Sequence, residues 1–509
     1  VKLIGRVNIE DNVIEELEGI FENADSNRKI ELPEEIPYTG RKGITLSDVY
    51  NDLNSVSNVC DETPLKNFVA QLSDEELSQI VRGEGMGSSL VTPGTAAAFG
   101  GVSKSLRDLG IAACCCDDGP SGMRLDCGTK AFSLPNGTLL ACTFNKELNE
   151  ELFSLLGLEM INNKVDCLLG PGINIHRHPL NGRNFEYFSE DPLVTGLIAT
   201  AQLKGLKKFG AGGTIKHFAG NNQELKRHTV DSVIGERALR EIYLRAFEIP
   251  VKSGYCDSVM TTYGKLNGTY TASNYDLCTT VLRKDWGYDG IVMTDWWASI
   301  DVAPDGQSVN NRFDKLIRSQ NDIYMVCPSG EENKNGDNTL ESLSNGNLTR
   351  GELQRAAVNI CRYVLHSPAF LRTIGKCTEV EIINRPKEND DVDSENVQYR
   401  KLDGEITIDL SNESSDIGAT FILAFDISKV GQYKITLSAS SELSELSQMT
   451  CTLFCTGFPV ATMTFHGTEG KIESISRETP LFSRFSIFRL VVGARGLKLH
   501  NIKFELVEE

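Results

Sequence analysis

Between residues 107 and 370 the sequence repeats one pattern: a short apolar segment ends in polar or glycine-rich residues, and a helical stretch follows. The apolar segments lie at residues 111–116, 165–169, 214–215, 258–262, 291–294 and 323–326. Helices are expected between them at residues 236–252, 276–286 and 349–365. Strand–helix alternation of this length predicts a parallel sheet and an α/β fold, here a (β/α)8-type barrel.

The strand expected at 291–294 runs directly into Asp295, Trp296 and Trp297. The carboxyl ends of the strands in such a barrel meet on one face, where functional groups gather. A carboxylate at that position is not core material, and the rings could stack on the flat face of a sugar. The alternative is a helix N-cap aspartate beside two core tryptophans.

Other strand ends also lead into polar side chains. These are Asp118, Arg124, Arg177, Arg183, Glu186, Lys216, His217 and Tyr263. Carboxylates accept hydrogen bonds from sugar hydroxyls and cationic side chains donate to them, so the set suits a neutral, hydroxyl-rich substrate. Singly, each residue has a structural alternative: Arg183 with Glu186 could be a plain salt bridge, and Lys216–His217 a solvated strand end.

Four segments are expected along the chain. They are a lead-in at 1–65 with a helix at 13–21, the barrel at 66–375, an acidic linker at 376–398 and an antiparallel β-sandwich domain at 399–509. In the last segment the apolar period changes to two, which predicts strands. These strands are expected at 420–425, 433–438, 449–454, 485–492 and 502–506. A structural role is favoured for the sandwich over carbohydrate binding.

Two sequences have the form of a helix capping box, Ser73 with Glu76 and Thr349 with Glu352. The glycines at 83–87 lack the GxGxxG spacing and a preceding strand, so they do not indicate a dinucleotide site. The triplet 114–116 is Cys-Cys-Cys inside an expected strand, which is typical of small buried apolar residues.

The net charge of −19 argues against nucleic acid and anionic membranes as partners. No run of about 18 apolar residues predicts a membrane span, and no signal peptide is visible. The 14 cysteines include no Cys-x-x-Cys pair, so we expect a reducing, cytoplasmic compartment and no structural zinc. No cofactor or metal is expected, because the acidic clusters lack calcium-loop spacing.

Taken together, these stretches resemble glycoside hydrolase family 3, β-glucosidase type. The matching stretches run from Asp118 to Arg124, from Gly182 to Asp191, from Lys216 to Phe218 and from Val292 to Trp296. The resemblance implies retaining hydrolysis of β-linked glucosides or oligosaccharides at the non-reducing end. It implies Asp295 as the nucleophile, and it places the sugar-contacting roles on Asp118, Arg124, Arg183, Lys216, His217, Tyr263 and Trp296.

Retaining hydrolysis needs two carboxyl groups about 5–5.5 Å apart, one as nucleophile and one as acid/base. We expect Asp295 to be kept ionised by Lys216, Arg183 or His217. The resemblance implies an acid/base glutamate from a second α/β domain, which precedes the barrel in some members. The expected source is therefore that domain, missing from this chain, or a second chain, or a glutamate such as Glu224 or Glu84.

Two other functions stay open. The β-N-acetylglucosaminidase branch of the same family uses an Asp–His pair on a loop, and His228 lies in that region, but Lys226 stands where the aspartate is expected. The second is a sugar-binding barrel without catalysis, which the same sugar-contacting residues would serve.

Overall fold

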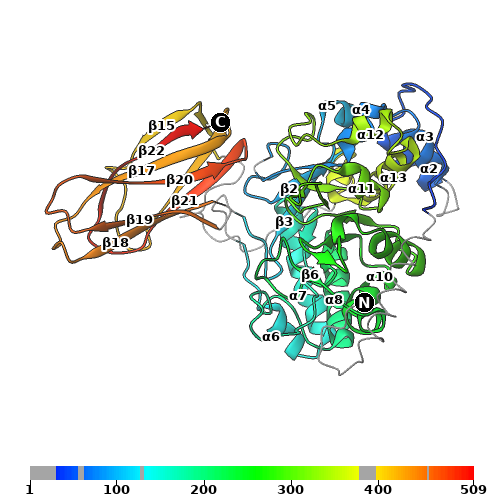
Figure 1. Cartoon of the computed structure of the whole chain (residues 1–509), viewed down its shortest axis with the longest axis horizontal. Coiled ribbons are helices and arrows are strands. Elements are labelled where there is room, and N and C mark those ends of the chain that lie inside the picture. The colour runs from blue at the N-terminus through cyan, green and yellow to red at the C-terminus, as the bar shows by residue number, and fades with distance from the viewer. Residues whose placement is uncertain are drawn as a thin grey trace. The chain divides into compact units, whose positions relative to one another are not determined.

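The structure, a computed structural model, describes residues 30–55, 62–86, 88–125, 131–377, 397–455 and 458–508. It forms two compact units, and the helices of Figure 1 belong to the first of them. The first unit contains Val1–Glu84, Ala97–Met123 and Phe132–Ile382; the second contains Gly85–Ala96, Arg124–Ala131 and Ile383–Glu509. The helix expected at 13–21 and most of the acidic linker lie outside the described residues. The domain limits expected from the sequence stay predictions.

The first unit is built on an eight-stranded, nearly closed sheet, as the (β/α)8-type prediction requires. In sheet order the strands are β10 (Ile291–Met293), β7 (Ser258–Thr261), β5 (Gly212–Phe218), β4 (Cys167–Leu169), β3 (Ala113–Asp118), β2 (Ala97–Gly100), β1 (Arg82–Glu84) and β13 (Tyr324–Cys327). A parallel bridge between Met293 and Ile323 links the two ends of the sheet. The strands expected from the apolar segments are all present within a few residues of their predicted limits.

The sheet departs from an all-parallel barrel at β2, which pairs antiparallel with both β1 and β3. β1 and β2 are three and four residues long, and β2 is wholly buried, so neither shows an alternating pattern in the sequence. A side chain at Gly101 would place its Cβ 2.1 Å from the carbonyl oxygen of Ile111, so the close turn from β2 towards β3 requires glycine.

Helices surround this sheet. They are α2 (Leu46–Ser55), α3 (Thr63–Val69), α4 (Asp74–Ile80), α5 (Lys104–Asp108), α6 (Gly137–Cys142), α7 (Lys146–Asn162), α8 (Pro192–Lys207), α9 (Glu236–Ala238), η1 (Leu239–Tyr243), α10 (Arg245–Lys252), η2 (Thr271–Ser273), η3 (Asp276–Asp285), α11 (Phe313–Arg318), α12 (Thr339–Ser344), α13 (Arg350–His366) and α14 (Pro368–Thr373). Both capping boxes form, at the starts of α4 and α13. The other two expected helices contain π-helical turns, η1 and η3, which sequence period alone does not separate from α-helix.

Two small sheets extend the loops of the first unit: β6 (Asp231–Ser232), β8 (Lys265–Leu266) and β9 (Thr269–Tyr270) form one, and β11 (Asp301–Val302) and β12 (Ser308–Val309) form the other. The core between sheet and helices is apolar and includes Leu203, Ile215, Val259 and Val292. Cysteines 114–116 are buried in β3, as predicted. Among the described residues, no helix is both long enough and apolar enough to cross a membrane.

The second unit is a two-sheet β structure, as expected. One sheet has the order β14 (Arg400–Leu402), β16 (Thr420–Ile427), β21 (Phe485–Val492), β18 (Gln448–Cys455) and β19 (Phe458–His466); the other has β15 (Glu405–Asp409), β22 (Lys498–Glu508), β17 (Gly431–Ser440) and β20 (Glu473–Leu481). The pairing is antiparallel except between β14 and β16. Phe425 and Phe488 of one sheet pack on Phe504 of the other, with ring centroids 4.8 and 5.5 Å away. β19 and β20 are strands that the sequence analysis did not include.

Candidate active site

Asp295 lies two residues beyond the end of β10, on the face where the parallel strands end. It is 7 % exposed. Its Oδ1 accepts a hydrogen bond of 2.8 Å from the backbone N–H of Trp296, and its Oδ2 has no hydrogen-bond partner among the described residues. One oxygen is therefore fixed by a backbone hydrogen bond, and the other accepts no hydrogen bond from the described residues.

Burial raises the pKa of the Asp295 carboxyl above its ordinary value. The positive charges of Arg183 and Lys216 oppose this rise, as do the backbone N–H of Trp296 and the Tyr263 hydroxyl. His217 supplies no charge, because burial and the neighbouring cations lower its own pKa well below the usual range. Of the three groups named as alternatives for keeping Asp295 ionised, Arg183 and Lys216 act through their positive charge, whereas His217 contributes no charge.

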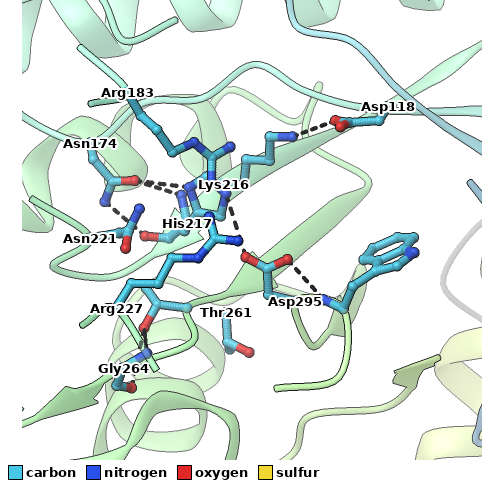
Figure 2. Close-up of polar contacts among 12 residues, drawn as sticks. Asp118, Asn174, Arg183, Lys216, His217, Asn221, Arg227, Thr261, Gly264 and Asp295 are labelled. Atoms are coloured by element: carbon cyan, nitrogen blue, oxygen red, sulfur yellow. Dashed lines mark hydrogen bonds and ion pairs between the residues drawn. The ribbon is translucent and has the colours of Figure 1, made fainter. Parts of the chain in front are cut away.

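Lys216 and His217 are consecutive on β5, yet both reach the site (Figure 2). Consecutive side chains of a regular strand point to opposite faces. The pairing of β5 with β7 shifts register between Lys216 and Phe218, and such an irregularity re-aims a side chain. Nζ of Lys216 donates to Oδ1 of Asp118, 2.8 Å away at the end of β3, and Nε2 of His217 lies 3.6 Å from Oδ2 of Asp295.

Asn174, which sequence reasoning did not select, holds His217 in place. Its Oδ1 accepts from the backbone N–H of His217, and its Nδ2 donates to the backbone carbonyl, each at 2.8 Å. Asn174 is 2 % exposed and follows the Gly170–Pro171–Gly172 turn after β4. A single asparagine after a turn gives no signal of this role in the sequence.

Arg183 lies on a loop that packs against the start of α6. At the start of α6, a Cβ on Gly137 would lie 2.1 Å from the carbonyl oxygen of Glu186, so glycine allows this close approach. The Thr138 hydroxyl donates to the backbone carbonyls of Asn184 and Tyr187, at 2.8 and 2.9 Å. On this loop Arg183 forms an ion pair with the buried Glu186, as one reading of the sequence expected. Arg183 still acts on Asp295, whose pKa it lowers.

Glu224 and Arg227 form a second polar group after β5. Nη1 of Arg227 lies 3.0 Å from Oε2 of Glu224, and Nδ2 of Asn221 donates to Oε1 at 2.9 Å. The guanidinium of Arg227 stands 4.4 Å from the ring centroid of Tyr263. Burial and the charge of Asp295 raise the pKa of Tyr263 well above its usual value, so the phenol is neutral. Tyr263 therefore lies near Asp295, as the sequence predicted.

For the other residues that the sequence analysis named, the structure gives fewer side-chain contacts with Asp295. Trp296 is buried and touches Asp295 through its backbone. Arg124 falls in a segment grouped with the second unit, so its side chain is not placed relative to this pocket. Glu84 ends β1, and His228 stacks on Tyr263 with centroids 4.3 Å apart.

Comparison with protein families matches residues 46–363 to the glycosyl hydrolase family 3 N-terminal domain. This match covers more than half of the chain and all of the residues just described. The chain belongs to glycosyl hydrolase family 3.

Its family relatives are longer than the chain itself. It is 54 % identical over 480 residues to a β-glucosidase of Ruminococcus albus, which covers 94 % of this chain and 49 % of that protein. A Paenibacillus barengoltzii β-glucosidase structure is 43 % identical with a TM-score of 0.64, over 95 % of this chain and 50 % of the other. A Thermotoga neapolitana β-glucosidase 3B, solved in complex with glucose, is 35 % identical with a TM-score of 0.55, over 62 % and 44 % of the two chains. The chain thus spans about half the length, or less, of these three proteins.

Proposed function

We propose that this chain carries the sugar-binding and nucleophilic centre of a retaining β-glucosidase, which removes β-D-glucosyl or related residues from the non-reducing end. The observation that carries the proposal is Asp295: a buried carboxylate at a barrel strand end, with one oxygen held and the other unpartnered. The β-glucosidase names of its family 3 relatives support the substrate class.

In the proposed reaction, Oδ2 of Asp295 attacks the anomeric carbon while the bond to the leaving oxygen breaks and that oxygen takes a proton from an acid. Water then attacks the glycosyl–Asp295 ester, gives a proton to the same group, and releases the sugar with its configuration retained. Lys216 and Arg183 supply positive charge beside the nucleophile, which lowers the cost of ionising a buried carboxyl.

The sugar itself is proposed to bind Asp118, Lys216, His217 and Arg183, with Tyr263 and Trp296 beside the reacting carbon. Asp118 and Lys216 already bond to each other, so hydroxyls of the substrate would share their donors and acceptors. Arg124 is proposed for the same role from the family motif alone.

The acid/base is proposed to come from outside this set of residues. Glu224 is engaged by Arg227 and Asn221, Glu186 by Arg183, and Asp118 by Lys216. The oxygens of these carboxyl groups are thus already engaged by donors of the chain itself. A further domain or chain that covers the pocket remains the proposed source.

The test is a 2-deoxy-2-fluoro-β-D-glucoside with a strongly activated leaving group, followed by intact-mass analysis and peptide mapping. Such a leaving group departs without an acid, so the result does not depend on the proposed external group. We expect one adduct, on the peptide that contains Asp295, and none in Asp295→Asn. Asp257→Asn is the matched control, because Asp257 precedes β7 at the opposite end of the barrel and pairs with Lys207.

An adduct on another residue, or none in the wild-type chain, would contradict the proposal. Saturable glucose binding without an adduct would support a sugar-binding barrel instead. Turnover of an N-acetylglucosaminide but no glucoside would support the other branch of the family. If Asp295 is labelled but glucosides with poor leaving groups are not hydrolysed, the acid/base lies outside this chain.

A further inference from the structure

Side-chain contacts form a closed ring that begins and ends at Asp295. The first residue in the ring after Asp295 is His217, and the last is Tyr263. From His217 the ring continues to Tyr187, Asn221, Glu224 and Arg227. Arg227 then packs on Tyr263, which neighbours Asp295. The mechanism above assigns nothing to Tyr187 or Asn221, although both are buried.

The imidazole of His217 is neutral, so one of its two ring nitrogens carries the single proton. Nε2 faces Oδ2 of Asp295 at 3.6 Å. Nδ1 lies 3.1 Å from the Tyr187 hydroxyl and 3.3 Å from Oδ1 of Asn174. The position of the proton decides whether His217 offers Asp295 a donor or a lone pair.

The hydrogen-bond partners of Asn174 and Asn221 fix which way each side-chain amide is oriented. Asn174 accepts from the backbone N–H of His217 and donates to its carbonyl, so a flipped amide would break both bonds (Figure 2). Nδ2 of Asn221 donates one hydrogen to the carboxylate of Glu224 and the other, at 2.8 Å, to the Tyr187 hydroxyl. The Tyr187 oxygen is therefore an acceptor towards Asn221 and keeps its own proton to donate.

Among the described residues, the acceptor within hydrogen-bond range of that proton is Nδ1 of His217. A proton on Nδ1 would leave the buried Tyr187 hydroxyl without an acceptor and turn the Nε2 lone pair towards a carboxylate. A proton on Nδ1 would gain only one hydrogen bond, of 3.3 Å, to Oδ1 of Asn174. That oxygen already accepts from the backbone N–H of His217. Leaving a buried hydroxyl without an acceptor costs more than one long hydrogen bond to an already engaged oxygen gains, so the Nε2 proton is favoured.

We propose that Tyr187, oriented by Asn221, is a positioning residue that fixes the proton of His217 on Nε2, so that a neutral donor faces Asp295 and the bound sugar. The residue acts through His217 and does not touch the reacting atoms. Tyr187 also packs edge-on against the His217 ring, with centroids 6.2 Å apart, and Tyr187→Phe keeps this packing while it removes the hydroxyl.

The direct test is nitrogen NMR of the full chain with ¹⁵N-labelled histidine, with the His217 signals assigned by their loss in His217→Gln. In the wild-type chain we expect Nδ1 to have the shift of an unprotonated nitrogen and Nε2 that of a protonated one. In Tyr187→Phe the two tautomers should mix. A protonated Nδ1 in the wild type would overturn the proposal, and this measurement depends neither on catalysis nor on the folding of Tyr187→Phe.

The kinetic test rests on the proposed function. The rate constant for labelling Asp295 with the activated 2-fluoro glucoside should fall about tenfold in Tyr187→Phe, the effect of one buried hydrogen bond. The matched control is Tyr288→Phe, which removes a buried hydroxyl that donates to the Ile291 carbonyl at the start of β10 and should leave the rate unchanged. Equal rates in Tyr187→Phe and the wild type would overturn the positioning role.

The two experiments distinguish a failure of the proposed function from a failure of the proposed tautomer. Absence of labelling in the wild-type chain would contradict the proposed function, while the NMR spectrum would still decide the tautomer. Normal labelling with a protonated Nδ1 would contradict the tautomer and leave the nucleophile in place.

Discussion

Nε2 of His217 and Oδ2 of Asp295 face each other at 3.6 Å across the end of the barrel, although the two residues come from strands separated by β7. The distance is longer than a hydrogen bond, and Oδ2 has no other partner among the described residues. A buried carboxylate oxygen that accepts no hydrogen bond costs folding free energy, so Oδ2 of Asp295 is held in this position at the expense of stability.

Removing the charge of Asp295 should stabilise the protein while it abolishes labelling. Asp295→Asn should raise the free energy of unfolding by about 1–2 kcal/mol, because a buried oxygen without a donor is replaced by a neutral amide. Hydrolysis of an activated glucoside should fall by roughly 10⁴-fold or more, since the proposed nucleophile is lost. Thermal denaturation and initial rates check both effects, and a variant that is both inactive and less stable would contradict the stability prediction.

The stability gain of Asp295→Asn should depend on pH. Because the pKa of Asp295 is raised by folding, the folded wild-type chain retains a proton that the unfolded chain loses. The contribution of this carboxyl to stability is therefore complete at pH values below its unfolded pKa and disappears as the pH rises through the folded pKa. The difference in Tm between variant and wild type should grow from pH 4 upwards; a difference that shrinks would contradict the direction of the shift.

Lys216→Met keeps a long apolar side chain but removes a positive charge that lowers the pKa of Asp295. We expect the acid limb of the pH profile for Asp295 labelling to move to higher pH, since labelling needs the ionised carboxylate. Lys207→Met is the control, because Lys207 pairs with Asp257 away from the site and should not move the profile. An acid limb that stays in place would exclude Lys216 as an electrostatic partner of Asp295.

Asn174→Ala should destabilise the barrel by about 2–4 kcal/mol, because it leaves both the N–H and the carbonyl of His217 buried without a partner. Calorimetry of the full chain measures the change in the transition of the first unit. Asn162→Ala, at the exposed last residue of α7, should change stability by less than about 0.5 kcal/mol. Equal effects of the two changes would show that the backbone clamp on His217 contributes little.

Trp297, two residues after Asp295, has a left-handed backbone conformation, with φ of 57° and 48 % of its surface exposed. Trp297→Gly should therefore be more stable than Trp297→Ala by about 1 kcal/mol. The order should reverse at Leu155, an exposed position inside α7, where glycine costs about 1 kcal/mol relative to alanine. Tm values of the four variants test this; alanine equal to or above glycine at Trp297 would contradict the backbone assignment.

The sequence determined the parts of this protein that depend on local pattern. Apolar segments bounded by polar residues located six strands of the barrel, and the change to a period of two located the second unit. Capping boxes located the starts of α4 and α13, because Ser or Thr three residues before Glu satisfies the first N–H groups locally. Polar residues at strand ends predicted that Asp295, Lys216, His217 and Asp118 lie close together, since barrel topology brings those ends together.

Only the tertiary structure decided the rest. The reversed β2 is four buried residues whose direction is set by its neighbours β1 and β3. The register shift in β5 that turns both Lys216 and His217 into the pocket depends on pairing with β7. Asn174, Tyr187 and Asn221 lie in loops and act through hydrogen bonds to His217 on β5 or to one another, and a single polar residue in a loop leaves no periodic signal in the sequence.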